Sequence, residues 1–278
     1  MLTSIVALIL RIASNPCANL FQKKLSETES SISVNLYSSL FMAIFALPLL
    51  FFVGFSYINS EFIFYVLLSG MLCFLGTICL IKALSIGEMS VLGPINSYKS
   101  VIGLLFAFIL LGEIPTTKAL FGFLLIVLAS FLFLDEKGQF ILNKSVFLRF
   151  LALFFTGIEA VIIKKIILLS SPLVAFIYWC FCGLIFSLIF GLLFKKVKLN
   201  NKKSLNGCFL IAILLFIMQI STNYVFDNVP VGLSLSLFQL SSVVSLVFGF
   251  RYFKEGGIIK KTIGTIIMII GSILILLK

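Results

Sequence analysis

Apolar residues form ten runs that are long enough to cross a lipid bilayer, and short polar segments separate them. A spanning helix needs about 20 mostly apolar residues. The pattern predicts helices over 2–22, 33–54, 62–84, 90–111, 116–134, 146–163, 173–194, 207–227, 231–250 and 259–277. Tight hairpins are expected at 112–115 and 254–257, and surface loops at 135–145 and 195–204. We therefore expect an all-α integral membrane protein without a separate soluble domain.

Composition and charge narrow the possible functions. The chain of 278 residues is 61% apolar and 11% charged, whereas soluble domains have about 45–50% apolar and about 25% charged residues. It contains no histidine, which excludes imidazole catalysis and histidine-ligated metals. Its six cysteines lie in apolar runs without metal-binding spacing, and its net charge of +11 comes mainly from basic residues near the ends of these runs. We expect no enzyme activity, no cofactor or metal, and no nucleic-acid partner.

The second half of the chain repeats the first. A shift of 142 positions aligns Glu113 with Glu255 and Gly122 with Gly264, and a shift of 141 aligns the pair Lys23–Lys24 with Lys164–Lys165. Each half contains five predicted helices, an odd number, so the two halves must enter the membrane in opposite orientations. We expect two inverted repeats, residues 1–140 and 141–278, with a substrate site near the membrane midplane between them.

The residues around the fourth and fifth predicted helices resemble a known family. The segment Ala83-Leu84-Ser85-Ile86-Gly87-Glu88-Met89-Ser90 through Leu111-Gly112-Glu113 resembles the EamA-type repeat of the drug/metabolite transporter superfamily. The copy in the second half, Asn228-Val229-Pro230-Val231-Gly232 through Lys254-Glu255 and Gly264 to Gly271, resembles it too. The resemblance covers the whole chain and implies a ten-helix carrier that moves a metabolite by alternating access.

The resemblance also assigns a packing role to small residues. In this family the last helix of each repeat packs against its counterpart, and here each of these helices has two small residues seven positions apart. The four positions are Gly122, Ala129, Gly264 and Gly271. Missing side chains let helices approach closely. The alternative is generic small-residue packing without a scaffold role.

Charged and amide side chains inside the predicted spans are the candidates for a substrate site, because an ionisable group at a helix centre costs about 2.5–3.5 kcal/mol on insertion scales. Arg11, Asn15 and Asn19 recur every fourth residue and share one helix face, which a cavity tolerates and lipid does not. Asn96 and Lys99 follow the Gly93-Pro94 break, where the proline is expected to free a backbone carbonyl for substrate. Further candidates are Tyr37, Thr77, Glu159, Tyr178, Trp179, Gln219, Asn223 and Gln239.

Structural interpretations of these residues stay open. Amides and hydroxyls in spans often form interhelical hydrogen bonds worth about 0.6 kcal/mol without any ligand. Arg11 and Lys99 are alternatively partners of Glu159 in a buried ion pair. Lysines near helix ends are expected to extend to lipid headgroups, and these are Lys23, Lys24, Lys82, Lys164 and Lys165.

The leading hypothesis is a secondary transporter of a small anionic or zwitterionic metabolite, of the amino-acid or organic-acid type. Arg11 would hold an acidic group, Lys99 would assist, and Glu159 would balance charge or transfer a coupling proton. The alternatives are a flippase of a lipid-linked substrate and an exporter of drug-like cations that uses Glu159. Asn15 and Thr156 stand where related small multidrug proteins carry glutamate, which disfavours the exporter.

The expected partners are the small-molecule substrate and the bilayer, and we expect a monomer in the cell (inner) membrane of a bacterium. Abundant Phe, Ile, Lys and Asn fit an AT-rich bacterial genome. Apart from Arg11 and Lys99, fifteen basic residues lie on the side reached after odd-numbered helices and four on the other. The positive-inside rule then places both termini outside the cytoplasm, whereas family members are generally drawn with both termini inside.

Overall fold

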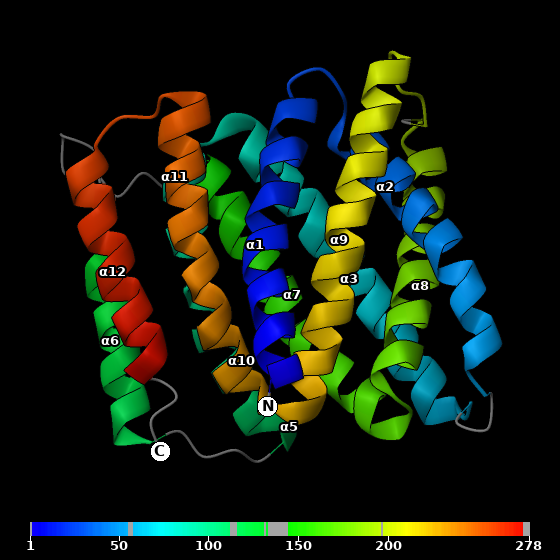
Figure 1. Cartoon of the computed structure of the whole chain (residues 1–278), viewed down its shortest axis with the longest axis horizontal. Coiled ribbons are helices and arrows are strands. Elements are labelled where there is room, and N and C mark those ends of the chain that lie inside the picture. Colours follow the sequence, from blue (N-terminus) through cyan, green and yellow to red (C-terminus); the bar gives the residue numbers. More distant parts are fainter. Residues whose placement is uncertain are drawn as a thin grey trace.

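The computed structural model describes residues 2–54, 58–111, 116–130, 132, 144–195 and 197–274. In these ranges ten helical segments run between two opposite faces of the molecule (Figure 1). The first half contains α1 (Leu2–Leu25), α2 (Ser31–Ala46) with η1 (Leu47–Phe52), α3 (Ser60–Ile86), α4 (Met89–Ile95) with α5 (Tyr98–Leu111), and α6 (Thr117–Ser130). The second half contains α7 (Lys144–Leu169), α8 (Pro172–Leu193), α9 (Lys202–Asn228), α10 (Val231–Leu237) with η3 (Phe238–Leu240) and α11 (Ser241–Phe253), and α12 (Ile258–Leu274).

The outer surface of this bundle is apolar. Seven of the described helical segments are long and apolar enough to cross a membrane. Large apolar side chains point outward, and Phe51, Ile109 and Ile259 are 90%, 67% and 76% exposed. A soluble monomer rarely exposes contiguous apolar surface of this extent. The structure is therefore that of an all-α membrane protein.

Two predicted helices are interrupted. The fourth is divided into α4 and α5, and the ninth into α10, η3 and α11. The short helices α4 and α10 have seven residues each and begin 142 positions apart, so the interruption is repeated in both halves. At the first break the Asn96 amide bonds to the Gly93 carbonyl at 3.0 Å, which is a tighter turn than the α-helical pattern.

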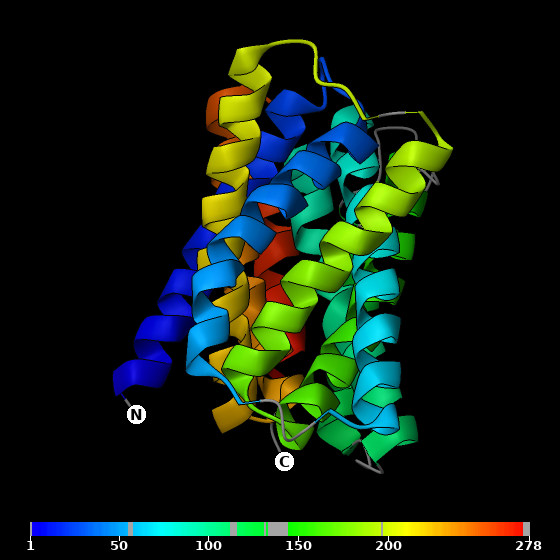
Figure 2. The same ribbon diagram turned by 90° about the vertical axis from the view of Figure 1, so that its right-hand side faces the viewer.

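The two chain ends described by the structure lie at one face, which we call the terminal face (Figures 1 and 2). The ends of α1, α3, α8 and α11 lie at the opposite face, which we call the basic face. Its described basic residues are Lys23, Lys24, Lys82, Lys144, Lys195, Lys198, Lys202, Lys203, Arg251, Lys254, Lys260 and Lys261. The hairpin predicted at 254–257 joins α11 to α12 at this face. The other predicted hairpin, 112–115, and most of the loop 135–145 lie outside the described residues.

Four residues of the basic face form what we call the Glu255 network. Lys23 Nζ donates to Glu255 Oε1 at 2.9 Å, and the Met89 and Ser90 amides donate to the two carboxylate oxygens at 2.8 and 2.7 Å. Glu255 thereby caps the exposed amides at the start of α4 from a distant loop. Lys23 also donates to the Gly87 carbonyl at 2.7 Å. Its ammonium group is therefore held by protein instead of extending to lipid headgroups as predicted.

The counterpart lysine in the second half also binds protein. Lys164 Nζ donates to the carbonyl oxygens of Phe226 and Asp227 at the end of α9. Lys23 binds a carbonyl just beyond the end of α3 in the same manner. These lysines satisfy backbone carbonyls at helix C-termini, which lack partners within the helix.

Helices α6 and α12 lie side by side at one end of the bundle (Figure 1). A Cβ atom built on Gly271 would lie 2.7 Å from the Gly122 carbonyl oxygen and 3.2 Å from the Ile126 amide nitrogen. Ala129 of α6 and Gly264 of α12 are also buried. The absence of a side chain at Gly271 therefore permits the close approach of α12 to the α6 backbone.

Replacing Gly271 with alanine is expected to destabilise the protein by about 1–3 kcal/mol, because the added methyl group overlaps backbone atoms that side-chain rotation cannot move. Thermal unfolding of the purified protein in detergent measures the effect. Gly232→Ala is the matched control, since a Cβ there meets nothing within 4 Å. Equal unfolding temperatures for the two variants would contradict the close approach of α6 and α12.

Candidate functional site

A cavity lies between the two halves of the bundle. Its volume is about 130 Å³, and its walls come from α1, α2, α3, α5, α7, α8, α9, α10 and η3 and from the break before α5. The predicted site residues that line it are Arg11, Asn15, Asn19, Thr77, Asn96, Lys99, Glu159, Trp179 and Gln219. Polar residues predominate from the centre toward the basic face, where Gln22, Asn35 and Ser39 continue the lining.

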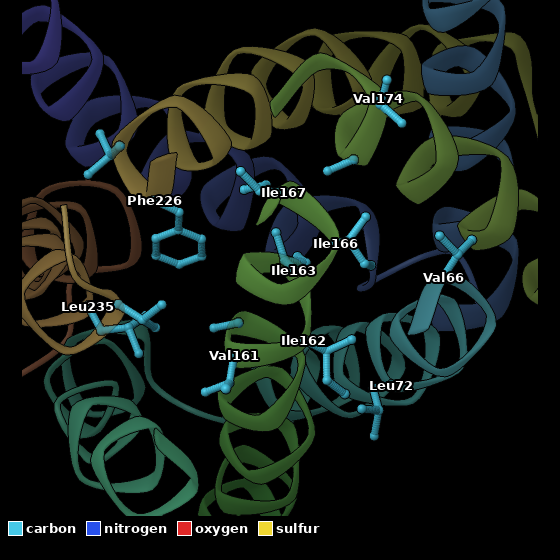
Figure 3. Close-up of a cluster of buried hydrophobic side chains, with 14 of the residues drawn as sticks. Val66, Leu72, Val161, Ile162, Ile163, Ile166, Ile167, Val174, Phe226 and Leu235 are labelled. Atoms are coloured by element: carbon cyan, nitrogen blue, oxygen red, sulfur yellow. The ribbon is translucent and has the colours of Figure 1, made fainter. Parts of the chain in front are cut away.

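An apolar cluster closes the cavity toward the terminal face. Phe226, Leu235, Phe238 and Ile163 belong to both the cavity wall and this cluster. Figure 3 shows the cluster around Ile162, Ile163, Ile166 and Ile167 of α7, with side chains from α3, α8, α9 and α10 surrounding it. A path from the cavity to the terminal face therefore requires these side chains to separate.

Arg11 brings unpartnered hydrogen-bond donors to the cavity. It is 7% exposed, and its Nε and Nη1 atoms are buried without a hydrogen-bond partner among the described residues. Its guanidinium carbon lies 4.6 Å from the centre of the Phe238 ring, a cation–π contact that leaves the N–H donors free. An uncompensated buried cation is costly, so this site favours an anionic group from outside the chain.

Arg149 is a second arginine of the cavity. It is 6% exposed; Nε donates to the Leu92 carbonyl at 3.1 Å, and Nη2 donates to Asn96 Oδ1 at 2.8 Å. The Leu92 carbonyl is available because the Asn96 amide bonds to Gly93 and Pro94 carbonyls instead. Arg149 thus occupies the Leu92 carbonyl, whereas the carbonyl that Pro94 leaves without a helical donor is that of Ser90, four positions earlier, so the offer of a backbone carbonyl to the substrate stays a prediction.

By sequence alone, Arg149 is one of the fifteen basic residues on the side reached after odd-numbered helices, at the membrane edge. A pattern in α7 would have indicated the cavity instead. Arg149, Ala152, Thr156, Glu159 and Ile163 recur every three or four residues, and all of them line the cavity. A helix face with this period is continuous, so Arg149 and Glu159 belong to one polar stripe.

Glu159 and Lys99 are close but not paired. Glu159 is 6% exposed, and its Oε1 accepts a hydrogen bond from Trp179 Nε1 at 2.7 Å. Lys99 lies within electrostatic reach of Glu159, Arg11 and Arg149. The salt bridges among the described residues are Lys23–Glu255 and Lys261–Glu88, so Glu159 forms none with Arg11, Lys99 or Arg149. The alternative interpretation of Arg11 and Lys99 as structural partners of Glu159 is not supported.

Four predicted site residues lie outside the cavity wall. Tyr178 packs against Phe62 with ring centres 5.1 Å apart, and Tyr37 is half-buried on α2. Asn223 is fully buried, where it accepts a hydrogen bond from Gln219 at 2.9 Å and donates to the Pro172 carbonyl at 3.1 Å. It positions a cavity residue without lining the cavity itself.

Gln239, the fourth, connects the helix breaks of the two halves. Its Oε1 accepts a hydrogen bond from Asn96 Nδ2 at 3.1 Å, and its Nε2 donates to the Leu235 carbonyl at 3.0 Å. Asn96 in turn accepts from Arg149. A continuous hydrogen-bond chain therefore runs from Arg149 on α7 through the first break to the second, which fixes both breaks around the cavity.

The sequence matches the model of the EamA-like transporter family twice, over residues 4–134 and 143–277. The two matches together cover nearly the whole chain, one for each half of the bundle. The chain belongs to the EamA-like transporter family.

This EamA-like transporter also shares its fold with solved structures. A crystal structure described only as "Crystal structure of protein" superposes with a TM-score of 0.71 at 13% sequence identity, covering 98% of this chain and 95% of that chain. At this identity the likeness concerns the fold alone. Among curated proteins, none matches the sequence significantly. Family membership makes the protein a multi-pass membrane transporter of the drug/metabolite type and not an enzyme.

Proposed function

We propose that this EamA-like transporter moves a small anionic or zwitterionic metabolite across the cell (inner) membrane. The observation that supports this substrate class is Arg11, a buried guanidinium beside the cavity whose Nε and Nη1 lack hydrogen-bond partners in the described part of the chain. Arginine pairs with carboxylate or phosphate through two parallel hydrogen bonds. An amino acid or an organic acid supplies such a group, which a lipophilic cation does not.

Cavity size supports a small metabolite. Pockets for drug-sized ligands have volumes of roughly 300–1,000 Å³, whereas this cavity holds about 130 Å³. The lining also places three cationic side chains against one carboxylate. Both properties favour a compact acid over the drug-like cation that Glu159 alone would select.

The proposed mechanism is alternating access between the repeats 1–140 and 141–278. The apolar cluster separates the cavity from the terminal face, while the Glu255 network connects α1, α4 and the α11–α12 hairpin at the basic face. Transport requires each of these contacts to open in turn. Arg11 and Lys99 hold the acidic group of the substrate, and Glu159 transfers the coupling proton.

Proteoliposome transport tests the proposal. Purified protein is reconstituted and supplied with radiolabelled amino acids, organic acids and a lipophilic cation, in vesicles with and without a proton gradient. We expect saturable uptake of an acid or amino acid. Uptake of the cation alone would contradict the proposed substrate class, and lipid movement without solute uptake would favour the flippase alternative.

Replacing Glu159 with glutamine is expected to abolish the response of uptake to a proton gradient, because the amide cannot exchange a proton. It keeps a carbonyl oxygen that can accept the hydrogen bond from Trp179. Substrate exchange without a gradient is expected to persist within about threefold, since it needs no net proton transfer. Gradient-driven uptake equal to that of the wild type would remove Glu159 from the coupling role.

A further inference from the structure

The charges of the cavity do not balance. Of the described residues that line it, Arg11, Lys99 and Arg149 carry cations and Glu159 carries the one carboxylate. When all four are ionised, the wall has a surplus of two positive charges. Surplus charge in a space shielded from water is costly unless an opposite charge accompanies it. The following inference rests on the proposed function and specifies the substrate of the same site.

The described residues of the cavity wall do not supply the missing negative charge. Glu159 uses Oε1 to accept the Trp179 N–H, and it forms no salt bridge with Lys99 or with either arginine. Arg11, Lys99 and Arg149 line the same cavity, so the three cations face one common space instead of separate sites. The described residues of the wall therefore leave the compensation to a ligand.

The two arginines retain hydrogen-bond donors for that ligand. A guanidinium has five N–H donors in a planar fork. Arg149 uses two of them, for the Leu92 carbonyl and for Asn96, and these bonds hold its side chain in place. Arg11 has no hydrogen-bond partner at Nε or Nη1 within the described ranges. The cavity thus contains one pre-oriented and one unoccupied guanidinium, on α7 and α1 in different halves of the chain.

We propose that the transported solute is a small dianion, and that Arg11 and Arg149 are its two anchoring residues. A dicarboxylate places one acidic group at each arginine, and a phosphate monoester presents two charges on one group. Both neutralise the two surplus positive charges of the cavity wall. A monocarboxylate neutralises one of them, and a neutral zwitterion neutralises neither. The anchors belong to different halves, so a bound dianion also connects the two repeats.

The single tryptophan of the chain provides a direct assay. Trp179 lines the cavity and contacts Glu159, so its fluorescence reports binding in the unmodified protein. The dicarboxylate arm compares succinate with succinamate and 4-aminobutyrate, which have similar size and fewer net negative charges. The phosphate arm compares methyl phosphate with dimethyl phosphate at pH 8. In at least one of the two comparisons, we expect the dianion to bind at least about tenfold more tightly than the compounds of lower negative charge.

Arginine variants test the assignment of the anchors. Arg149→Gln is expected to reduce the affinity for the dianion to that for its singly charged partner, while the affinity for that partner changes less than threefold. Arg251→Gln is the matched control, because Arg251 is exposed at the basic face away from the cavity wall. Arg149→Lys, which retains the charge, is expected to recover part of the lost affinity.

The outcomes separate this inference from the proposed function. If neither dianion binds more tightly than its partners, or if 4-aminobutyrate binds best, the dianion is excluded while a transporter of monoanions or zwitterions stands. If tetraphenylphosphonium quenches Trp179 and none of the anions or zwitterions does, both proposals are wrong. A preference for the dianion in the wild type that Arg149→Gln and Arg251→Gln lower equally would exclude Arg149 as an anchor.

Discussion

Replacing Arg11 with alanine is expected to abolish transport and to weaken substrate binding roughly 10- to 100-fold. Hydrogen bonds to charged groups contribute about 1.5–3 kcal/mol, and about 1.4 kcal/mol corresponds to a tenfold change in affinity. Arg11 has buried donors without partners, so its removal leaves no protein acceptor unsatisfied at those atoms. The loss of affinity therefore reports the bond to substrate rather than a damaged fold.

Two further variants distinguish the loss of the Arg11 guanidinium from the loss of positive charge alone and from a general effect of removing an arginine. Arg11→Lys keeps the charge without the planar fork, and we expect it to retain binding at an intermediate level. Arg251→Ala removes an exposed arginine from the basic face and is expected to transport as the wild type does. Trp179 fluorescence measures binding, and vesicle uptake measures transport. Normal uptake by a folded Arg11→Ala protein would exclude Arg11 from the substrate site.

Replacing Glu255 with alanine is expected to lower the free energy of unfolding by about 2–4 kcal/mol. Its carboxylate accepts three hydrogen bonds, from Lys23 and from the amides of Met89 and Ser90. Bonds of this kind to a charged group are stronger than neutral ones, and their loss leaves buried donors without partners. Glu27→Ala is the control, since Glu27 is an exposed glutamate on the same face. Thermal or denaturant unfolding in detergent measures both variants.

The same network predicts a pH dependence of stability. Burial alone would raise the pKa of Glu255, but hydrogen bonds from Ser90, Lys23 and Met89 outweigh it and lower the pKa below its usual value. An unfolded glutamate titrates at about 4.3. The stabilisation is therefore fully present above that pH and is lost as the pH falls through the lower folded pKa. Glu255→Gln is expected to reduce this part of the acid sensitivity, and an unchanged acid profile would contradict the charged state of Glu255.

The membrane fold and its duplication can be predicted from the amino-acid sequence. Runs of about 20 apolar residues permit little besides spanning helices, because the bilayer offers no partner for backbone polar groups. Repeated charges such as Glu113 and Glu255 indicated two halves, and the family match falls on the same two halves. Arg11, Asn15 and Asn19 were identifiable as one polar face because helical periodicity is local.

Which polar groups meet depends on how the helices pack. By sequence Arg149 is a membrane-edge residue, but in the structure it lies beside Asn96 and binds the Leu92 carbonyl. By sequence Lys23 contacts lipid headgroups, but in the structure it pairs with Glu255, which is 232 positions away in the chain. Asn223 and Gln239 are amide side chains within apolar runs, as several cavity residues are, but they form hydrogen bonds with other protein groups and do not line the cavity. The spacing and length of an apolar run determine the position and the buried face of one helix. The pairing of buried polar groups depends instead on which helices pack together, and this is fixed only when the whole bundle forms.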